Sequence, residues 1–223
     1  MKIVILVPEY NEGVLAVATI KKILKNTENS VVVIDDGSTE SSYKLIQKAF
    51  KDNQRVIVKR HLINLGKGST MKTGVELAWK LGYEAVIFVD ADGQHNPKYL
   101  RKFEKELEVS PVVFGYRLMD KNMPLMRRWG NILATNLVRL FFNIRKKDLL
   151  SGYLGFRREV YPQIEWSAKR YGVETEMATK IGKYKIKFSE IKIDTIYIDK
   201  YKGVTILDAL KILIQIPFWY LAK

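Results

Sequence analysis

The alternation of two periodicities over the first 115 residues is the feature that most constrains the fold. Short runs rich in β-branched residues alternate with stretches in which apolar residues recur every three to four positions. The strand-like runs are almost continuously apolar, which is typical of strands buried on both faces of a parallel sheet. We therefore expect an α/β fold with a mostly parallel central sheet flanked by helices. The strand-like runs are 3–7, 31–35, 55–59, 85–90 and 112–116, and the helical stretches are 13–27, 40–52, 68–82 and 97–108.

Polar clusters follow three of these predicted strands. Residues 8–12 follow the first strand, residues 35–38 the second and residues 90–95 the fourth. Ligands of parallel α/β sheets bind beyond the carboxyl ends of the strands. The three clusters are therefore expected to converge on one edge of the sheet and to form a binding site there.

Asp90 and Asp92 are the clearest candidates for metal ligands. Because side chains alternate along a strand, both carboxylates are expected on one side, with Ala91 pointing away. The carbonyl oxygen of Gln94 completes a hard-oxygen donor set suited to Mg²⁺ or Mn²⁺. The alternative interpretation is a capped turn before a helix that begins near Pro97.

The other polar turns are weaker signals on their own. An aspartate at a strand end, such as Asp35 or Asp36, is able to accept an N–H of a nucleobase, but Asp-Gly-Ser-Thr is also ordinary turn and capping sequence. Residues 64–69 lack the spacing of a P-loop. Lys67 and its flanking glycines nevertheless precede a predicted helix, where phosphates bind. Tyr10 either faces a base or ribose or is a buried aromatic.

The order of these segments is more specific than any one of them. Pro-x-Tyr-Asn-Glu (8–12), Asp-Asp-Gly-Ser (35–38), Asn-x-Gly-Lys-Gly (64–68) and Asp-Ala-Asp-Gly-Gln-His-x-Pro (90–97) occur in succession at predicted strand ends. In this order they closely resemble family 2 glycosyltransferases of the GT-A fold. The chain is most similar to the branch of dolichyl-phosphate mannosyltransferases and polyprenyl-phosphate glucosyltransferases. The resemblance continues at residues 115–117, 127–131, 148–153 and 174–176, so it covers nearly the whole chain.

The resemblance implies an inverting, metal-dependent transfer of a hexose to a polyprenyl or dolichyl phosphate. The donor would be a nucleoside-diphosphate sugar of the GDP-mannose or UDP-glucose type, and the cation Mn²⁺ or Mg²⁺ would stabilise the leaving diphosphate. The residues implied in binding the nucleotide sugar are Pro8, Tyr10, Glu12, Asp35, Asp36, Lys67, Asp90, Ala91 and Lys202. The implied metal ligands are Asp90, Asp92 and Gln94, with Asp92 also catalytic, and the acceptor-phosphate residues are Arg117, Arg127, Arg128 and Ser151.

The chemistry of the acceptor decides whether a base is needed. A lipid phosphate is already an anion, whereas a sugar hydroxyl requires a carboxylate base near the anomeric carbon. Glu174 and Glu176 lie where many relatives place that base, so transfer to a glycan hydroxyl with Glu176 as catalytic base is the alternative function. Lys202 stands in a segment where relatives carry arginine or lysine, and it lacks the bidentate fork of arginine.

The composition limits the partners. The net charge is +14, and most of the excess lies after residue 115, which favours an anionic partner. No nucleic-acid-binding motif is present, and acidic strand ends would repel a phosphate backbone, so we expect no nucleic acid. The absence of cysteine excludes thiolate metal sites and fits a reducing cytoplasm. The five apolar residues near the start are too few for a signal peptide.

The second half contains a helical pattern at 125–144, a turn at 151–153, a possible strand at 153–158, helices within 159–183 and an extended segment at 185–198. The apolar phase slips between Phe188 and Ile191, which predicts a bulge or turn there.

We expect one catalytic domain over residues 1–203, with a nucleotide-binding half (1–115) and an acceptor half (116–203). An amphipathic helix over 204–223 follows, and the two charges and Pro217 within residues 206–222 are unsuited to a membrane span. This helix lies at a membrane interface, or it packs on the core or on a second subunit. The first alternative predicts a peripheral enzyme on the cytoplasmic face of the cell membrane. The oligomeric state is left open.

Overall fold

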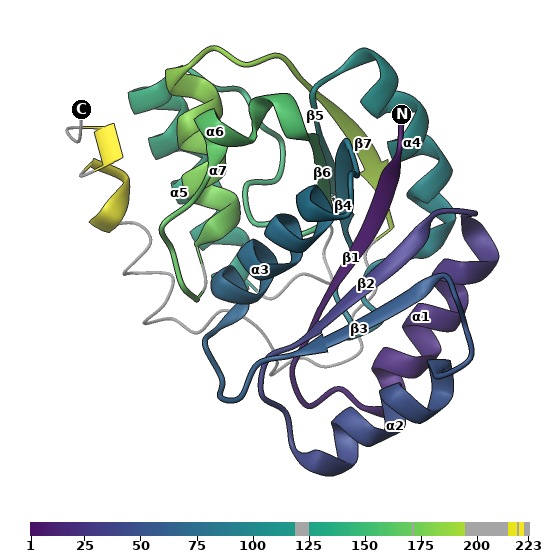
Figure 1. The fold of residues 1–223 in the computed structure, drawn as a ribbon. Coiled ribbons are helices and arrows are strands. Elements are labelled where there is room, and N and C mark those ends of the chain that lie inside the picture. Colours follow the sequence, from purple (N-terminus) through teal and green to yellow (C-terminus); the bar gives the residue numbers. More distant parts are fainter. Residues whose placement is uncertain (119–124, 171, 195–213, 218, 221–223) are drawn as a thin grey trace.

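A seven-stranded sheet forms the centre of the molecule, and helices cover both of its faces (Figure 1). The computed structural model describes residues 1–118, 125–170, 172–194, 214–217 and 219–220, and of residues 125–131 it describes the backbone alone. In chain order the strands are β1 (Ile3–Glu9), β2 (Ser30–Asp35), β3 (Val56–Arg60), β4 (Ala85–Phe88), β5 (Val112–Arg117), β6 (Leu154–Arg157) and β7 (Phe188–Ile193).

The spatial order of the strands is β3-β2-β1-β4-β6-β5-β7. The neighbouring pairs β1/β2, β2/β3, β1/β4 and β5/β7 are parallel, whereas β6 runs antiparallel to both β4 and β5. The expected mostly parallel α/β sheet is therefore confirmed. The carboxyl ends of β1, β2 and β4 meet at one edge because these strands are parallel neighbours.

Two apolar layers hold the helices on the sheet. The helices are α1 (Val14–Asn26), α2 (Glu40–Phe50), α3 (Lys67–Lys80), α4 (Leu100–Val109), α5 (Leu125–Phe142), α6 (Tyr161–Ile164) and α7 (Val173–Lys183), with single 3₁₀ turns at Pro97–Tyr99 and Arg158–Val160. One core contains residues of α1, α2 and α4, and the other contains residues of α3, α5, α6 and α7. Figure 1 shows these two groups on opposite faces of the sheet.

The helices form where apolar residues recur at helical spacing. In α1 the buried residues are Ala16, Thr19, Ile20 and Ile23, which form one stripe. Alternate residues of β1 enter opposite cores: Val4 and Leu6 join the α3 side, and Ile3, Ile5 and Val7 join the α1 side. A strand that supplies both cores is apolar along its length.

Of two predictions for the second half, one is confirmed and one was wrong. Helices lie within residues 159–183 as expected, with α6 ending at Ile164 and α7 beginning at Val173. No bulge or turn separates Phe188 from Ile191, since β7 pairs with β5 in continuous register. Among the described strands β7 pairs only with β5, and its first five residues are half-buried or exposed. A break in the alternation of apolar and polar residues therefore exposes little apolar surface that a regular strand would bury.

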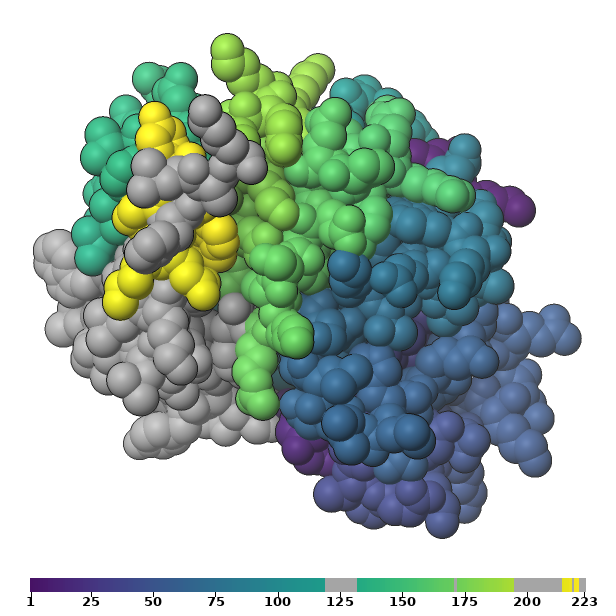
Figure 2. Space-filling model, turned by 60° about the vertical axis from the view of Figure 1, so that its left-hand side comes forward, coloured from purple at the N-terminus to yellow at the C-terminus, as the bar shows by residue number. Residues whose placement is uncertain are grey.

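The described part of the C-terminal segment lies against α5. Residues 214–217 and 219–220 are helical, and Ile216 is buried within the core on the α5 side. The ring of Tyr220 lies 5.5 Å from Phe141 and 5.7 Å from Phe142 between centroids. Figure 2 shows the same contact as yellow atoms beside the teal atoms of α5. The rest of the predicted helix over 204–223 lies outside the described residues. No described helix is both long and apolar enough to cross a membrane.

Candidate active site

The ends of β1, β2 and β4 are joined by backbone hydrogen bonds. The N–H of Asp36 donates to Glu9 O at 2.8 Å, and the N–H of Val89 donates to Leu6 O at 3.0 Å. The three polar clusters predicted from the sequence therefore lie side by side at one edge of the sheet.

Lys67 is at the centre of the charged groups beside this edge. It is the first residue of α3, and its Nζ lies 3.0 and 3.1 Å from the two carboxylate oxygens of Asp90 and 3.2 Å from Oε1 of Glu174. Burial by itself disfavours the ammonium, but the charges of Asp90 and Glu174 raise the pKa of Lys67. Burial likewise opposes ionisation of Asp90, yet the charge of Lys67 holds the pKa of Asp90 below its usual value. Lys67, Asp90 and Glu174 together form the charged triad of this site.

The loop before β6 packs directly on this triad. A Cβ added to Gly152 would lie 3.0 Å from Lys67 Nζ, 3.1 Å from Asp90 Oδ2 and 3.2 Å from Glu174 Oε1. Ser151, the preceding residue, is buried, and its hydroxyl has no hydrogen-bond partner among the described residues. Any side chain at position 152 would therefore crowd these charged atoms, and the Ser151 predicted for the acceptor lies next to the charged triad.

Asp90 and Asp92 lie in a loop rather than on a strand. Because β4 ends at Phe88, strand alternation does not orient these two side chains, contrary to the reasoning from the sequence. Asp92 instead accepts hydrogen bonds from the backbone N–H and the side-chain amide of Gln94, both at 2.9 Å. Burial raises the pKa of Asp92 to about 6, and the nearby charge of Asp90 also raises it. Among the described residues no three His, Cys, Asp or Glu side chains are grouped to hold a metal ion.

His95 holds the backbone of Asp90 in place through a hydrogen bond. Its Nδ1 accepts the backbone N–H of Asp90 at 3.0 Å, and its ring stacks on Tyr153 with centroids 4.9 Å apart. Tyr153 stacks in turn on Phe103 at 4.4 Å. Burial lowers the pKa of His95 to about 4, so the imidazole is neutral at pH 7. The stack fixes the backbone that carries Asp90.

Asp36 organises the loop between β3 and α3. Its Oδ1 accepts the N–H of Leu65 at 2.9 Å and contacts His61 Nδ1 at 2.9 Å, and its Oδ2 accepts the N–H of Gly66 at 2.8 Å. The N–H of Ser69 donates to Lys169 O at 3.1 Å. Three backbone N–H groups near Lys67 are therefore already bonded within the protein. The group that this segment adds to the charged triad is the Lys67 side chain.

The residues predicted to bind the nucleotide sugar differ in exposure. Tyr10 is 48% exposed, Pro8 and Glu12 are partly exposed, and Ala91 is buried with its carbonyl accepting the Thr19 hydroxyl at 3.2 Å. Asp35 is fully buried beneath them. Tyr10 is thus open to a ligand at the sheet edge.

The residues predicted for the acceptor are only partly described. Arg117 Nε donates to Asp148 Oδ2 at 2.7 Å, and Asp148 is buried. Burial opposes ionisation of Asp148, but Arg117 holds the pKa of Asp148 below its usual value. Arg127 and Arg128 belong to α5, where the backbone alone is described, and Lys202 lies outside the described residues.

Glu176 holds the loop between α6 and α7. Its carboxylate accepts the N–H of Ser167 at 2.9 Å, the hydroxyl of Ser167 at 3.1 Å and the N–H of Ala168 at 2.9 Å, and it pairs with Lys180 at 3.0 Å. The structure thus brings Glu174, not Glu176, into contact with the Lys67–Asp90 pair.

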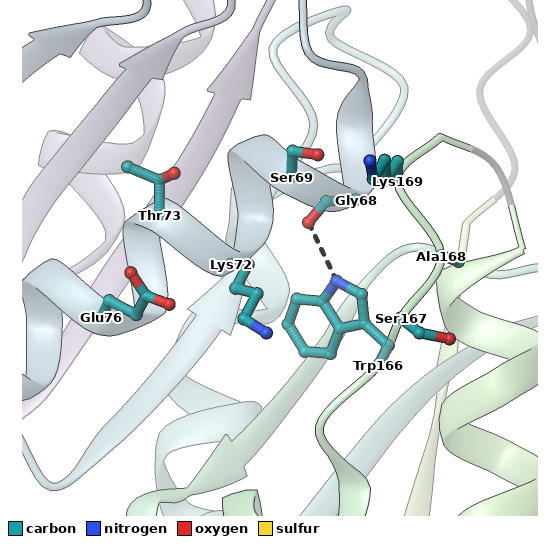
Figure 3. A pocket seen from close by; sticks show the side chains of 9 residues that line it. All are labelled: Gly68, Ser69, Lys72, Thr73, Glu76, Trp166, Ser167, Ala168 and Lys169. Atoms are coloured by element: carbon teal, nitrogen blue, oxygen red, sulfur yellow. Dashed lines mark hydrogen bonds between the residues drawn. The ribbon is translucent and has the colours of Figure 1, made fainter.

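The same loop closes on the start of α3. The indole N–H of Trp166 donates to Gly68 O at 2.9 Å, as the dashed line in Figure 3 shows. A hollow of about 260 Å³ lies here between α3 and residues 166–169. None of the predicted site residues lines it. It is therefore separate from the charged triad.

Four residues of the site carry too little signal to be predicted from the sequence alone. Glu174 is a glutamate two positions from Glu176, His95 is one more polar residue in a turn, and Gly152 has the sequence of an ordinary turn glycine. Glu9 is the unspecified residue of the Pro-x-Tyr-Asn-Glu segment. Its burial at the strand end is visible only in three dimensions.

The sheet order and the strand-end cluster of acidic residues define a GT-A fold. The model of the family described as glycosyl transferase family 2 matches residues 4–164. The chain therefore belongs to glycosyl transferase family 2, and the resemblance found in the sequence is confirmed.

Individual relatives extend over almost the whole chain. An uncharacterised protein of Methanocaldococcus jannaschii is 32% identical over 96% of this chain and 90% of its own length. The UDP-N-acetylglucosamine–dolichyl-phosphate N-acetylglucosaminyltransferase of Methanococcus voltae is 26% identical over 99% of this chain and 97% of its own.

A solved structure shares the fold. Glucosyl-3-phosphoglycerate synthase from Mycobacterium tuberculosis, in complex with Mn²⁺, UDP and phosphoglyceric acid, matches with a TM-score of 0.75 at 16% identity. The match covers 99% of this chain and 78% of that one. At this identity the likeness shows the GT-A fold alone.

Proposed function

We propose that this glycosyltransferase moves a hexose from a nucleoside-diphosphate sugar to a polyprenyl or dolichyl phosphate, with inversion at the anomeric carbon. The observation that carries the proposal is the contact of the Ser151–Gly152 loop with the Lys67–Asp90–Glu174 triad. It supports an arrangement in which an acceptor at Ser151 and Arg117 meets a donor at Asp90 and Lys67. The relative from Methanococcus voltae, named for transfer to dolichyl phosphate, supports the same acceptor.

The donor diphosphate would lie near Lys67, whose ammonium is the cation among the described residues that faces both halves of the site. Pro8, Tyr10 and Glu12 offer the partly exposed surface at the end of β1 for the base and ribose. Asp35 and Asp36 are buried beneath this surface and shape it through the turns they bind. Ala91 and Lys202 keep their proposed roles in donor binding.

The residues near Asp92 fit a divalent cation. Burial, and after it the charge of Asp90, raises the pKa of Asp92 to about 6, and a cation would offset both effects. The donor set is two carboxylates and the Gln94 carbonyl, all hard oxygens suited to Mg²⁺ or Mn²⁺, with the donor's phosphate oxygens completing it. Bound there, the cation would stabilise the charge of the departing diphosphate. The chain's own part is to hold Asp92 through Gln94 and Asp90 through His95.

A phosphate acceptor is consistent with the carboxylates near the triad. Glu176 is engaged by four donors, and Glu174 is paired with Lys67. A general base must be within reach of the proton it removes. Transfer to a glycan hydroxyl with Glu176 as base is therefore the less supported alternative. A cationic surface, with net charge +14, suits an anionic acceptor presented at the cytoplasmic face of a membrane.

A screen of donors and acceptors tests this function. The chain is incubated with UDP- and GDP-sugars, with Mn²⁺ or Mg²⁺, with and without a short-chain polyprenyl phosphate in detergent. We expect transfer to the lipid phosphate that is lost on chelation and in Asp92→Asn. Transfer that survives both treatments would overturn the metal-dependent mechanism, and transfer to glycan hydroxyls but never to lipid phosphate would overturn the acceptor.

A further inference from the structure

Glu9 and Asp35 are two buried carboxyl groups at paired positions of neighbouring strands. They are register partners at the ends of β1 and β2, and they are 2% and 0% exposed. Ser38 binds both of them, since its N–H donates to Asp35 Oδ1 at 3.2 Å and its hydroxyl donates to Glu9 Oε2 at 2.9 Å. The two groups therefore belong to one polar cluster.

The hydrogen bonds of this cluster leave one atom without a partner. Oε1 of Glu9 accepts the N–H of Glu12 at 2.7 Å, the N–H of Gly13 at 3.3 Å and the hydroxyl of Ser42 at 3.1 Å. By contrast, Oδ2 of Asp35 has no donor among the described residues, and it is inaccessible to solvent. A ligand at the surface cannot reach this oxygen. A protonated carboxyl group inside the cluster would supply a donor for it.

Two carboxylates in contact cannot both remain ionised in a buried site, so such pairs retain a proton. Here the carboxyl group paired with Asp35 in register, and joined to it through Ser38, is that of Glu9. We propose that Glu9 and Asp35 share one proton, donated by Glu9 to Oδ2 of Asp35, and that Glu9 thereby acts as a positioning residue for the nucleotide site.

The shared proton holds two turns together. Glu9 binds the start of α1 through Glu12 and Gly13, and the turn after β2 through Ser38. The N–H of Asn11 donates to the same Ser38 hydroxyl at 2.8 Å. These turns flank Tyr10, so the geometry of the proposed base and ribose surface depends on the pair. This consequence rests on the proposed function, whereas the shared proton does not.

The other charged groups around the pair leave the proton on Glu9. Arg60 of β3 lies 3.3 Å from Asp35 Oδ1, so a positive charge faces the Asp35 side of the pair. Arg60 also pairs with Glu40 of α2, so its positive charge is divided between Asp35 and Glu40. From α1 and α2 the cluster receives neutral donors, and Glu12 directs its backbone N–H toward Glu9. Burial first, and then the contact with Asp35, raises the pKa of Glu9 to about 7.

Carboxyl titration tests the shared proton directly. Side-chain carboxyl carbons of glutamate are labelled with ¹³C, and spectra are recorded from pH 5 to 9 for the wild type, Glu9→Gln and Asp35→Asn. We expect one resonance, absent from Glu9→Gln, to titrate near pH 7 and to move to lower pH in Asp35→Asn, where the neighbouring charge is gone. A Glu9 resonance that titrates below pH 5 in the wild type would overturn the proposal.

Nucleotide affinity tests the positioning role. Binding of UDP and GDP with Mg²⁺ is measured at pH 6.5 and 8.5 for the wild type, Glu9→Gln and Glu108→Gln, a charge-matched control on the exposed face of α4. Wild type and control should lose about 20-fold in affinity at the higher pH if binding needs the protonated pair. Glu9→Gln, whose amide donates permanently, should change at most about twofold.

A wild-type pH dependence that persists unchanged in Glu9→Gln would contradict the positioning role. Absence of nucleotide binding at every pH, together with the expected titration of Glu9, would uphold the shared proton and refute the proposed donor site. The two failures are therefore distinguishable.

Discussion

Lys67 and Glu174 form an ion pair of 3.2 Å between the two halves of the chain. Lys67 begins α3 in the nucleotide-binding half, and Glu174 lies in the first turn of α7 in the acceptor half. Because Lys67 also contacts Asp90 at 3.0 Å, one ammonium links a proposed metal ligand to a helix that sequence order places more than eighty residues away.

Removing the shared cation should destabilise the fold. Lys67→Met leaves Asp90 and Glu174 close together without a counter-charge, which we expect to cost roughly 2 kcal/mol of unfolding free energy, less than for a wholly buried pair. The double variant Lys67→Met, Glu174→Gln should recover part of this loss. Urea denaturation of the four proteins of the cycle checks it, and strictly additive effects would show that the pair is not coupled.

Adding one methyl group at Gly152 should disrupt the triad. Gly152→Ala places its Cβ within 3.0–3.2 Å of three charged atoms, so we expect transfer activity to fall at least about 10-fold while the protein stays folded. Gly74→Ala in α3 is the matched control, because its added Cβ meets only ordinary contacts at 3.4 Å or more. Kinetics and melting temperatures are measured for both. Equal activity in the two variants would refute the tight packing of this loop on the site.

Glu176→Gln separates a structural role from a catalytic one. The variant replaces one acceptor oxygen of the bonds to Ser167 and Ala168 with an amide nitrogen, which should cost about 1–3 kcal/mol in stability. Turnover per folded molecule should fall less than 10-fold, because a phosphate acceptor needs no base. Loss of turnover by a thousandfold or more, with an unchanged melting temperature, would instead favour the hydroxyl acceptor.

Stability should fall with rising pH because of Glu9. Its pKa in the folded state is about 7 against an ordinary 4.5, so the folded state binds more protons than the unfolded state between these values. The stabilising contribution of Glu9 to the free energy of unfolding is fully present below pH 4.5 and is lost as pH rises through 7. Urea midpoints at pH 5.5 and 8 should therefore differ more in the wild type than in Glu9→Gln. Asp92 and Lys146 titrate in both proteins, so the difference isolates Glu9.

The fold was predictable because it depends on repeated, local patterns. Strands such as β1 are apolar along their whole length, and α1 repeats its buried residues at helical spacing. These patterns predict the five strands of the first half with ends that lie within two residues of those in the structure. The prediction of a bulge or turn in β7 was wrong because the first residues of this strand are half-exposed, and their apolar pattern says little about the register of the strand.

The site was predictable in its location but not in its contacts. Strand order brought Asp35, Asp90 and their neighbours to one edge, as expected. Glu174 and Glu176 belong to one helical turn, and the sequence does not distinguish them. The position of α7 against the rest of the fold determines that Glu174 contacts Lys67, whereas Glu176 binds the loop before α7. Asp90 lies beyond the end of β4, so its orientation depends on His95 and Lys67 instead of strand alternation.

The most direct test of the proposed function is the chemical bond formed by the sugar. Donors labelled with ¹³C at C1 are incubated with polyprenyl phosphate and Mn²⁺, and the lipid-extracted product is examined by ¹³C and ³¹P NMR. The proposed function predicts a labelled C1 coupled to the phosphorus of the lipid, with the anomeric configuration opposite to that of the donor. A product in which C1 is bonded to a hydroxyl oxygen without phosphorus coupling, or in which the configuration is retained, would contradict it.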